Sequence, residues 1–174
     1  LNQSAARTAK HLMVFVTRRD HWKKHARWNY NNVKKSIGDK EPTKRDIRGL
    51  ESYGELMPLV YRRDWFGFST LIRRIICFVK GFSNPFMRVN GNRDHRVLVH
   101  KSCALAAQTF ILSITAHGFD SCPMEGFDPK LVRKALKLPK GAEINMIVAV
   151  GKGTPKGIHG ERKRIPLNET LFKI

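Results

Sequence analysis

Two stretches of the sequence carry residue types that could hold a ligand. The first, SCPMEGFD at residues 121–128, places a carboxylate, Glu125, next to Gly126 in an otherwise apolar run. Because glycine has no Cβ, the backbone at Gly126 can approach a flat ligand closely, and backbone N–H groups in such a turn can donate to acceptor atoms on a ring. Glu125 could orient the loop or be held in a structural ion pair, and the residues alone leave both interpretations open.

The second stretch is a cluster of three cations, Arg162, Lys163 and Arg164, just before Pro166. Successive side chains of an extended chain point to opposite sides, so two of the three can face one anion. The guanidinium fork of arginine matches a phosphate with two parallel hydrogen bonds. A charged surface tail explains the same residues equally well.

A glycine-rich stretch, GKGTPKG at residues 151–157, follows an apolar segment. Glycine-rich turns after strands are typical of phosphate sites. Neither GxGxxG nor GxxxxGK[ST] is present, however. The favoured interpretation is therefore a flexible surface loop.

The elements that must position these stretches can be read from the apolar pattern. HLMVFVTR (11–18) and the start of AEINMIVAVGKG (142–153) predict buried strands. Residues 94–117 predict a long helix that is buried on several sides, with Gly118 at its C-terminal end. Asp128 and Pro129 predict the start of a short helix within 127–141, with Leu131, Ala135 and Leu136 facing inward. The order of elements is strand, basic helical region, long helix, loop, short helix, strand and tail, which indicates an α+β fold.

Two further segments lie in the middle of the chain. RRDHWKKHARW (18–28) mixes aromatic residues with cations, which could stack bases or anchor an amphipathic helix, and the second interpretation is preferred. WFGFSTLIRRIICFVKGF (65–82) has the length of a membrane span, but Arg73 and Arg74 at its centre would be costly in lipid. A helix that packs in a soluble protein is expected, ahead of one lying on a membrane surface.

The composition sets limits on the class of protein. The chain has 174 residues, 41% of them hydrophobic, enough for one domain with a core. The three cysteines form no CxxC pair and no zinc-like cluster with histidine, so we expect no metal and free buried thiols. The polar first ten residues are unlike a signal peptide, and together with the thiols they predict a cytoplasmic location.

The sequence resembles the nitroreductase family at several points. Residues 118–128, GFDSCPMEGFD, resemble its G-(L/F)-x-(S/A)-x-(P/x)-(I/M)-(E/x)-G-F-D stretch. RKRIPL (162–167) is similar to its (K/R)-x-R-x-P-(L/x) phosphate-binding segment, and IVAVG (147–151) looks like its penultimate strand. Residues 2–15 resemble the segment that enters an early strand of its sheet. The resemblance covers residues 1–16 and 96–174 and is thin over 17–95.

This resemblance implies an architecture. The fold would be α+β, with a nitroreductase-like sheet packed by helices and residues 94–117 as the long central helix of a homodimer. Residues 1–174 would form a single nitroreductase-like domain, with 17–95 as a variable helical region within it. The family's N-terminal Arg-Arg-Ser-x-Arg phosphate clamp and the strand after it are not in the sequence. The domain is therefore expected to be N-terminally incomplete.

The resemblance also implies an FMN site at the subunit interface. The backbone around Glu125 and Gly126 would face the N5 and O4 edge of the flavin, where its donors could stabilise negative charge on the reduced ring. Lys163 would point away from the phosphate that its two neighbouring arginines hold. The implied cofactor-binding residues are Asn2, Pro123, Met124, Glu125, Gly126, Arg162 and Arg164. The resemblance assigns no side chain as catalytic acid or base.

Two classes of function follow. The resemblance implies an FMN-dependent NAD(P)H oxidoreductase, which would pass hydride by a ping-pong cycle from NADH or NADPH to a nitroaromatic, quinone or similar acceptor. The net charge of +19 favours instead a basic protein that binds nucleic acid or an anionic membrane surface without redox activity. Two motifs in the right order outweigh charge, which is a nonspecific signal. Nucleic acid is therefore not expected as a partner, whereas a peripheral membrane contact is compatible with either function.

Overall fold

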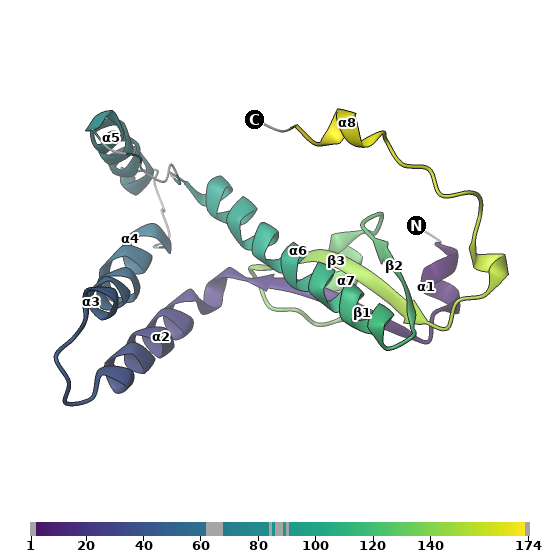
Figure 1. Ribbon diagram of the computed structural model, residues 1–174, viewed down its shortest axis with the longest axis horizontal. Helices are drawn as coiled ribbons and strands as arrows, with labels where there is room; N and C mark the ends of the chain where they lie inside the picture. Colours follow the sequence, from purple (N-terminus) through teal and green to yellow (C-terminus); the bar gives the residue numbers. More distant parts are fainter. Residues whose placement is uncertain (1–2, 62–67, 84, 86–88, 90, 173–174) are drawn as a thin grey trace.

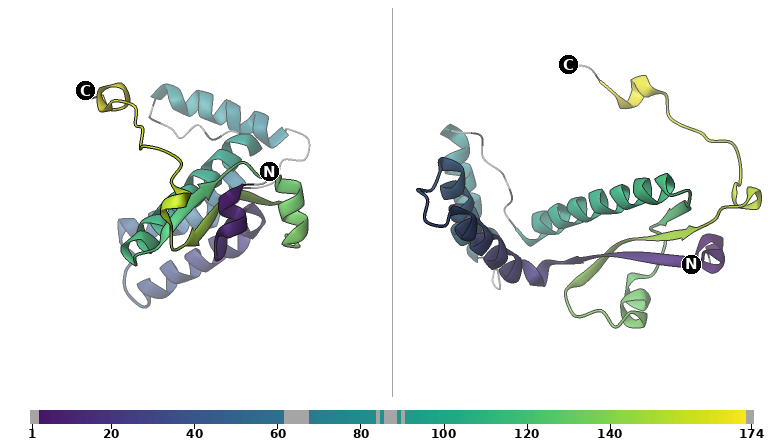
Figure 2. Two further views of the ribbon diagram at one scale, coloured as in Figure 1. Left: turned by 90° about the vertical axis from the view of Figure 1, so that its right-hand side faces the viewer. Right: turned by 60° about the horizontal axis from the view of Figure 1, so that its bottom comes forward.

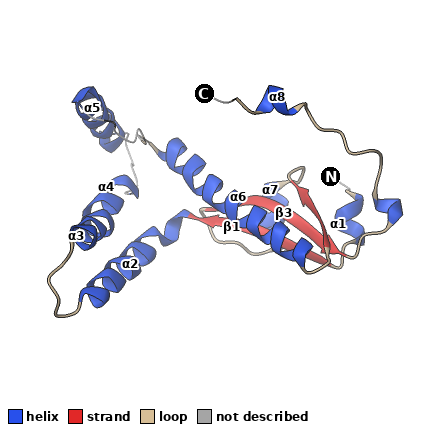
Figure 3. Ribbon diagram, viewed as in Figure 1, coloured by secondary structure: helices blue, strands red, loops and turns tan. Residues whose placement is uncertain are grey.

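The computed structural model describes residues 3–61, 68–83, 85, 89 and 91–172. Asn2, which the sequence predicts to bind the cofactor, lies outside the described residues. Within the described part, a small sheet carries one long helix, and a group of shorter helices forms an arm beside one end of the sheet (Figures 1 and 3). The α+β fold predicted from the sequence is confirmed.

The sheet has three antiparallel strands in the order β1–β3–β2. β1 (His11–Arg18) and β2 (Asp120–Met124) both pair with β3 (Ala142–Gly151), so His11 lies opposite Val150 and Met124 lies opposite Ile147. Residues 11–18 and 142–151 are strands as predicted, but β1 is not the buried strand that was expected: Thr17 is its buried residue, and Leu12 and Met13 are exposed because β1 lies at an edge of the sheet. The segment 120–124 was expected to be a loop, and that prediction is wrong, because pairing with β3 extends it into a strand.

One face of the sheet packs against two short helices. α1 (Ser4–Thr8) and α7 (Pro129–Ala135) lie on either side of a core cluster of four buried residues. The partly buried side chains around it come from the chain start, β1 and the α7 region. The buried residues of this cluster are Met124, Ile144, Ile147 and Ala149. The end of β2 is thereby fixed to the same core as the first helix.

The opposite face of the sheet lies against α6 (Asn92–Ala116). Alternate residues of a strand point to opposite faces: Val14 packs on the cluster just described, whereas the ring of Phe15 meets that of Phe110 in α6 edge to face at 5.6 Å. Val148, in the central strand, is fully buried. The central strand therefore contributes to the packing on both faces.

α6 ends in a Schellman motif, as the glycine after it predicts. Gly118 adopts φ +72°, its N–H donates to the Thr115 carbonyl at 2.9 Å, and the Phe119 N–H donates to the Ile114 carbonyl at 3.0 Å. The predicted helix 94–117 is confirmed within two residues at its start and one at its end.

The expectation that α6 is buried on several sides is wrong for the single chain. Of its side chains only His95 and Ala107 are buried, and Val97, Leu105 and Leu112 are exposed. Among the described helices α6 has the length and apolar composition to cross a membrane. This is weak evidence for a span, because a core helix of a soluble protein meets the same criteria.

α7 begins at the predicted residue, but the residues that it turns toward the sheet are not the predicted ones. The Asp128 carboxylate accepts from the N–H groups of Lys130 and Leu131, and Pro129 occupies the first helical position. Leu131 and Leu136 are exposed, which corrects the prediction that they face inward. The buried contacts come from Val132 and Leu138. Ala135 is exposed as well.

The arm consists of short helices between β1 and α6. In order they are α2 (Trp22–Ile37), α3 (Lys44–Glu51), the π-helical turn η2 (Ser52–Leu56), α4 (Met57–Tyr61) and α5 (Phe68–Ser83). Figure 2 shows α2, α3 and α5 grouped at the end of β1 from which α2 starts. The prediction that this basic region is helical is confirmed. Trp22 stacks on Tyr61 and acts as an anchor, whereas Trp28 is 65% exposed and does not.

Candidate functional site

The turn at Glu125 and Gly126 lies where β2 ends at the edge of the sheet. Met124, the last residue of β2, is buried in the core cluster, while Glu125 and Gly126 are exposed immediately after it. The Phe127 N–H donates to the Glu125 carbonyl at 2.9 Å, which closes a tight turn before α7. Pro123 has no N–H to donate, and such a residue is tolerated because β2 is an edge strand. The turn is thus held on both sides but open to a ligand.

The start of the chain packs on the same core cluster as the end of β2. Ala5 in α1 and Ala9, which follows α1, pack on the cluster that contains Met124. The predicted ligand Asn2 precedes α1 and is not described. The described residue nearest to it in the chain, Gln3, is half-buried at the N-terminal end of α1. Two of the three predicted regions are therefore anchored to one core.

The third predicted region, around Arg162 and Arg164, is not brought to the turn within one chain. Both residues are exposed in the segment between η3 (Pro155–Gly157) and α8 (Leu167–Thr170). This segment leaves the sheet beyond α1 and turns back without packing on the core (Figures 1 and 2). The Arg164 guanidinium donates to the Lys163 carbonyl at 3.2 Å. In the described part of the chain, neither arginine forms an ion pair with a carboxylate.

The glycine-rich loop after β3 has a structural task. Lys152 donates through Nζ to the Gly118 carbonyl and lies 4.6 Å from the centre of the Phe119 ring. The Gly153 N–H donates to the Asp120 carboxylate at 2.8 Å. These contacts fix the loop to the connection between α6 and β2. The segment is therefore a surface loop, as expected from the sequence, but it is held in place and is not flexible at Lys152 and Gly153.

Sequence reasoning missed a polar cluster between α6 and the sheet. Glu143, on β3, accepts from Arg19 at 3.2 Å, from Arg96 in α6 and from His100 Nε2 at 3.2 Å. Asn145 Nδ2 lies 3.1 Å from His100 Nδ1, so a neutral His100 can donate to Glu143 and accept from Asn145. Two polar residues at alternate positions of an apolar strand were the signal that could have indicated this cluster.

The electrostatics of Glu143 follow from its neighbours. Burial alone would raise the pKa of its carboxyl, but the hydrogen bonds from Arg96 and His100 and the charge of Arg19 outweigh burial and hold the pKa below its ordinary value. Glu143 is therefore ionised at neutral pH and fixes the first half of α6 to the sheet. Such a satisfied carboxylate is a structural group rather than an acid or base for catalysis.

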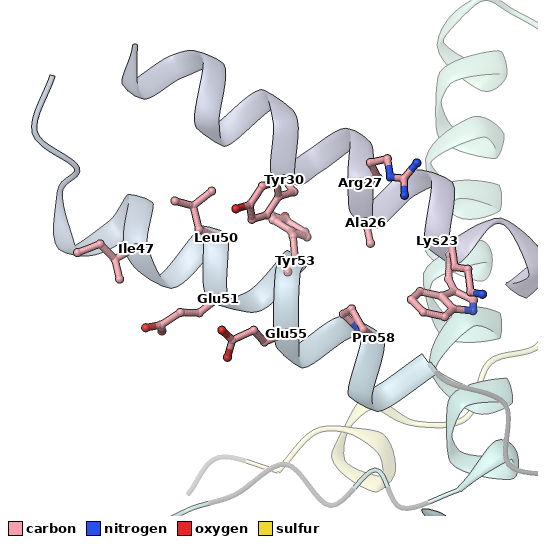
Figure 4. Close-up of a pocket in the computed structure, with 12 residues that line it drawn as sticks. Lys23, Ala26, Arg27, Tyr30, Ile47, Leu50, Glu51, Tyr53, Glu55 and Pro58 are labelled. Atoms are coloured by element: carbon pink, nitrogen blue, oxygen red, sulfur yellow. The ribbon is translucent and has the colours of Figure 1, made fainter. Parts of the chain in front are cut away.

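A pocket in the described part of the chain lies in the arm rather than at the predicted site. It has a volume of about 650 Å³ and lies between α2 and the segment from α3 to α4. Figure 4 shows Tyr30 and Tyr53 between the two helical segments, with Glu51 and Glu55 pointing away from α2. None of the predicted cofactor-binding residues lines it.

The described residues contain no group of three histidine, cysteine, aspartate or glutamate side chains placed to hold a metal ion. Cys77 is buried, Cys103 is half-buried and Cys122 is exposed, and all three are free thiols. The expectation of buried thiols is thus wrong for Cys122, because it lies on the edge strand β2.

A three-stranded sheet with a long helix on one face, and an exposed turn that ends its edge strand, define an α+β architecture. The family model described as the nitroreductase family matches residues 1–152. The chain belongs to the nitroreductase family. The match includes the arm and the Glu125–Gly126 turn, and it ends before Arg162.

A curated relative and two solved structures show how far the similarity extends. MhqN of Bacillus subtilis, provisionally named an NAD(P)H nitroreductase, is 31% identical over 84 residues, which are 48% of this chain and 41% of that protein. The aligned part of this chain therefore corresponds to less than half of the length of that relative. YdfN of Bacillus subtilis, provisionally named a nitroreductase, superposes with a TM-score of 0.66 at 19% identity, covering 99% of this chain and 67% of that one.

A second solved structure contains a flavin. It is a protein of Exiguobacterium sibiricum, provisionally named a nitroreductase, in complex with FMN. It superposes with a TM-score of 0.59 at 14% identity and covers 100% of this chain and 67% of that one. At these identities the superpositions establish the fold, and the predicted nitroreductase-like architecture is confirmed.

Proposed function

We propose that this chain forms part of an FMN-dependent NAD(P)H oxidoreductase that reduces nitroaromatic, quinone or similar acceptors. The observation that carries the proposal is the exposed Glu125–Gly126 turn, anchored by Met124 in a chain of the nitroreductase family. The FMN in the Exiguobacterium sibiricum structure and the name of MhqN support the choice of flavin and electron donor. When bound, FMN supplies the two-electron redox chemistry of a ping-pong cycle.

The residues of the turn would hold and orient the cofactor. Met124 fixes the end of β2 in the core, so the backbone after it has a defined position. The N–H groups at Glu125 and Gly126 would donate to the polar edge of the ring, and the missing Cβ of Gly126 would leave room for its plane. Pro123 would line the approach from the strand side. Asn2, just before α1, would reach the same ring.

Arg162 and Arg164 fit the phosphate of the cofactor chemically. Both guanidinium groups are exposed and free of carboxylate partners in the described chain, so both forks are available to an anion. Lys163 would point to the other side of the extended segment. The segment does not pack on its own sheet, and a bound phosphate or a second subunit would order it.

We further propose that two copies of this chain pair along α6. Its exposed face carries Val97, Leu105 and Leu112 together with small residues, which permits close approach of a second helix. Such a dimer would cover the apolar surface of α6 without a membrane span, and the protein would act in the cytoplasm. Size-exclusion chromatography with light scattering tests this. A monomer at micromolar concentration would contradict it.

The flavin assignment is tested on the purified full-length protein. The absorbance spectrum and the cofactor released on denaturation identify any bound flavin, and added FMN is titrated against the apoprotein. We expect FMN to bind and NADH or NADPH to bleach its absorbance. Absence of binding at saturating FMN would contradict the proposal and leave the basic surface as the better lead to function.

A further inference from the structure

α5 (Phe68–Ser83) presents an apolar stripe to solvent. The stripe residues recur at spacings of three and four, which places all of them on one side of the helix. Each is between 41% and 76% exposed, and none is polar. We call this set the α5 stripe; its members are Phe68, Leu71, Ile72, Ile75, Phe78, Val79 and Phe82.

α5 buries a charged side chain and exposes its apolar ones, whereas a helix of a soluble protein normally does the opposite. Arg73 and Cys77, four residues apart, are the buried side chains of α5, with 5% and 6% exposure. Arg73 donates through Nη1 to the Val60 carbonyl at 3.0 Å, at the end of α4. An arginine therefore points inward, and the apolar stripe points outward. An exposed apolar patch of this size marks an interaction surface.

The charges beside the stripe indicate what covers it. Arg74 is exposed at the edge of the stripe, Lys80 is exposed near the C-terminal end of the same helix, and α5 contains no aspartate or glutamate. Pairing of two α5 helices would bring cations together with no acid on either helix to neutralise them. An anionic lipid surface supplies negative charge at the rim of the stripe and an apolar layer at its centre.

We propose that α5 is a docking helix for a membrane surface that contains anionic phospholipids. The stripe would insert among the acyl chains, Arg74 at its edge would contact headgroup phosphates, and Lys80 would add positive charge near the surface. The 16-residue helix is about 24 Å long, less than the roughly 30 Å hydrocarbon core. It would therefore lie in the plane of the surface. Figure 1 shows α5 at the outer end of the arm, away from the sheet, where a flat surface can reach it.

The proposal is tested by flotation of the full-length protein with lipid vesicles. One set contains phosphatidylcholine alone, and the other contains phosphatidylcholine mixed with phosphatidylglycerol. We expect binding to the anionic vesicles that weakens at high salt. The double variant Ile75→Glu, Phe78→Glu should bind at least about tenfold more weakly, because it places two charges in the inserted stripe. Arg74→Glu with Lys80→Glu should lose the preference for anionic vesicles.

A matched control keeps the test specific. Leu131→Glu makes the same kind of change at an apolar residue of similar exposure on α7, and it should leave vesicle binding unchanged. Circular dichroism and a melting curve confirm that each variant is folded. Three results would each overturn the proposal: no binding of the unmodified protein to anionic vesicles, equal binding by the stripe variant, or a stripe variant that halves the mass in light scattering, which would show that a second copy covers the stripe.

Discussion

The imidazole ring of His95 stacks on the ring of Tyr61, with centroids 5.1 Å apart and an interplanar angle of 8°. The Trp22 ring also stacks on this tyrosine, with centroids 6.2 Å apart. The three rings come from α6, α4 and the start of α2, so they join the arm to the long helix. His95 is 3% exposed, and its Nε2 is buried without a hydrogen-bond partner. The stack is a junction between the arm and α6 whose buried member is His95, and burial favours the neutral form of that histidine.

The junction should weaken in acid. Burial lowers the pKa of His95, the charges of Arg73 and Arg19 lower it further, and Asp94 raises it slightly. Because the folded pKa lies below 6.5, its ordinary value, the stabilising contribution is complete above that pH. As the pH falls below 6.5, the unfolded chain takes up the proton more readily and stability is lost.

His95→Phe tests this dependence, since phenylalanine keeps a stacked ring but cannot be protonated. The melting temperature of the unmodified protein should fall between about pH 7.5 and about pH 5.5 more steeply than that of the variant. His95→Ala should cost roughly 1 kcal/mol of stability beyond the lost area, because it removes the ring pair. Parallel pH profiles for the unmodified protein and His95→Phe would contradict the account.

The stability that Glu143 contributes should also be lost in acid, at a lower pH than the contribution of His95. Its folded pKa is held below the ordinary value of 4.5, so its contribution is present above that value and lost as the pH falls through the folded pKa. Glu143→Gln removes the charge that Arg19 and Arg96 contact and should destabilise the protein by roughly 1.5 kcal/mol in denaturant unfolding at neutral pH. Glu161→Gln, in the exposed tail, is the control and should change stability little. Equal stabilities of the two variants would show that the cluster is not structural.

The end of α6 offers a test of backbone conformation. Gly118 has φ +72°, a value that other residues rarely adopt. Gly118→Ala should cost about 1 kcal/mol, because a Cβ disfavours the left-handed conformation. Gly157→Ala is the matched control, since a Cβ there meets nothing within 4 Å and its φ is not in that region. The two melting curves should therefore differ, and coincident curves would contradict the assigned Schellman motif.

Much of this fold can be predicted from the sequence where the signal is local. Two apolar runs gave the strands at 11–18 and 142–151, and the capping residues Gly118 and Asp128 marked the helix ends. β2 could not be predicted, because DSCPM becomes a strand only by pairing with residues 147–151 of β3. The inward face of α7 was mispredicted because Leu138, after the helix, turns back to the core through Lys137 at φ +50°.

The candidate site was predictable only in part. The residues of the Glu125–Gly126 turn came from a resemblance to a family, and the periodicity of the sequence did not point to them. Glu143 and Asn145, at alternate positions of an apolar strand, indicate a polar contact on one face, but their partners in α6 lie more than 40 positions away, so the local pattern could not identify them. Arg162 and Arg164 are exposed and are not brought to the turn within the described chain, and no pattern in the sequence indicates where the tail lies.

A substitution at Gly126 can test whether the flavin lies close to the backbone there without straining that backbone. Its φ is not among the positive values in the described chain, so a larger residue is compatible with its backbone. Gly126→Val should therefore leave the melting temperature of the apoprotein nearly unchanged, while the added side chain blocks the flavin plane and weakens FMN binding by at least about tenfold. Unchanged FMN affinity in this variant would show that the cofactor does not approach the turn.

Substitution of either arginine of the tail should weaken FMN binding, whereas substitution of the lysine between them should not. Arg162→Ala and Arg164→Ala should each weaken FMN binding by about tenfold, because each removes charge-assisted hydrogen bonds to the phosphate. Lys163→Ala should have little effect, because we propose that Lys163 points to the other side of the extended segment. Riboflavin, which lacks the phosphate, should bind all four proteins with similar affinity. If the lysine variant lost as much FMN affinity as the arginine variants, the effect would be general charge and not a phosphate site.

The flavin content of the purified full-length protein tests the central claim most directly. The protein is denatured, the released cofactor is identified by chromatography and mass, and its amount is compared with the protein concentration. We expect FMN, or an apoprotein that takes up one FMN per protomer on addition. A folded protein that neither carries nor takes up FMN would contradict the proposed oxidoreductase function.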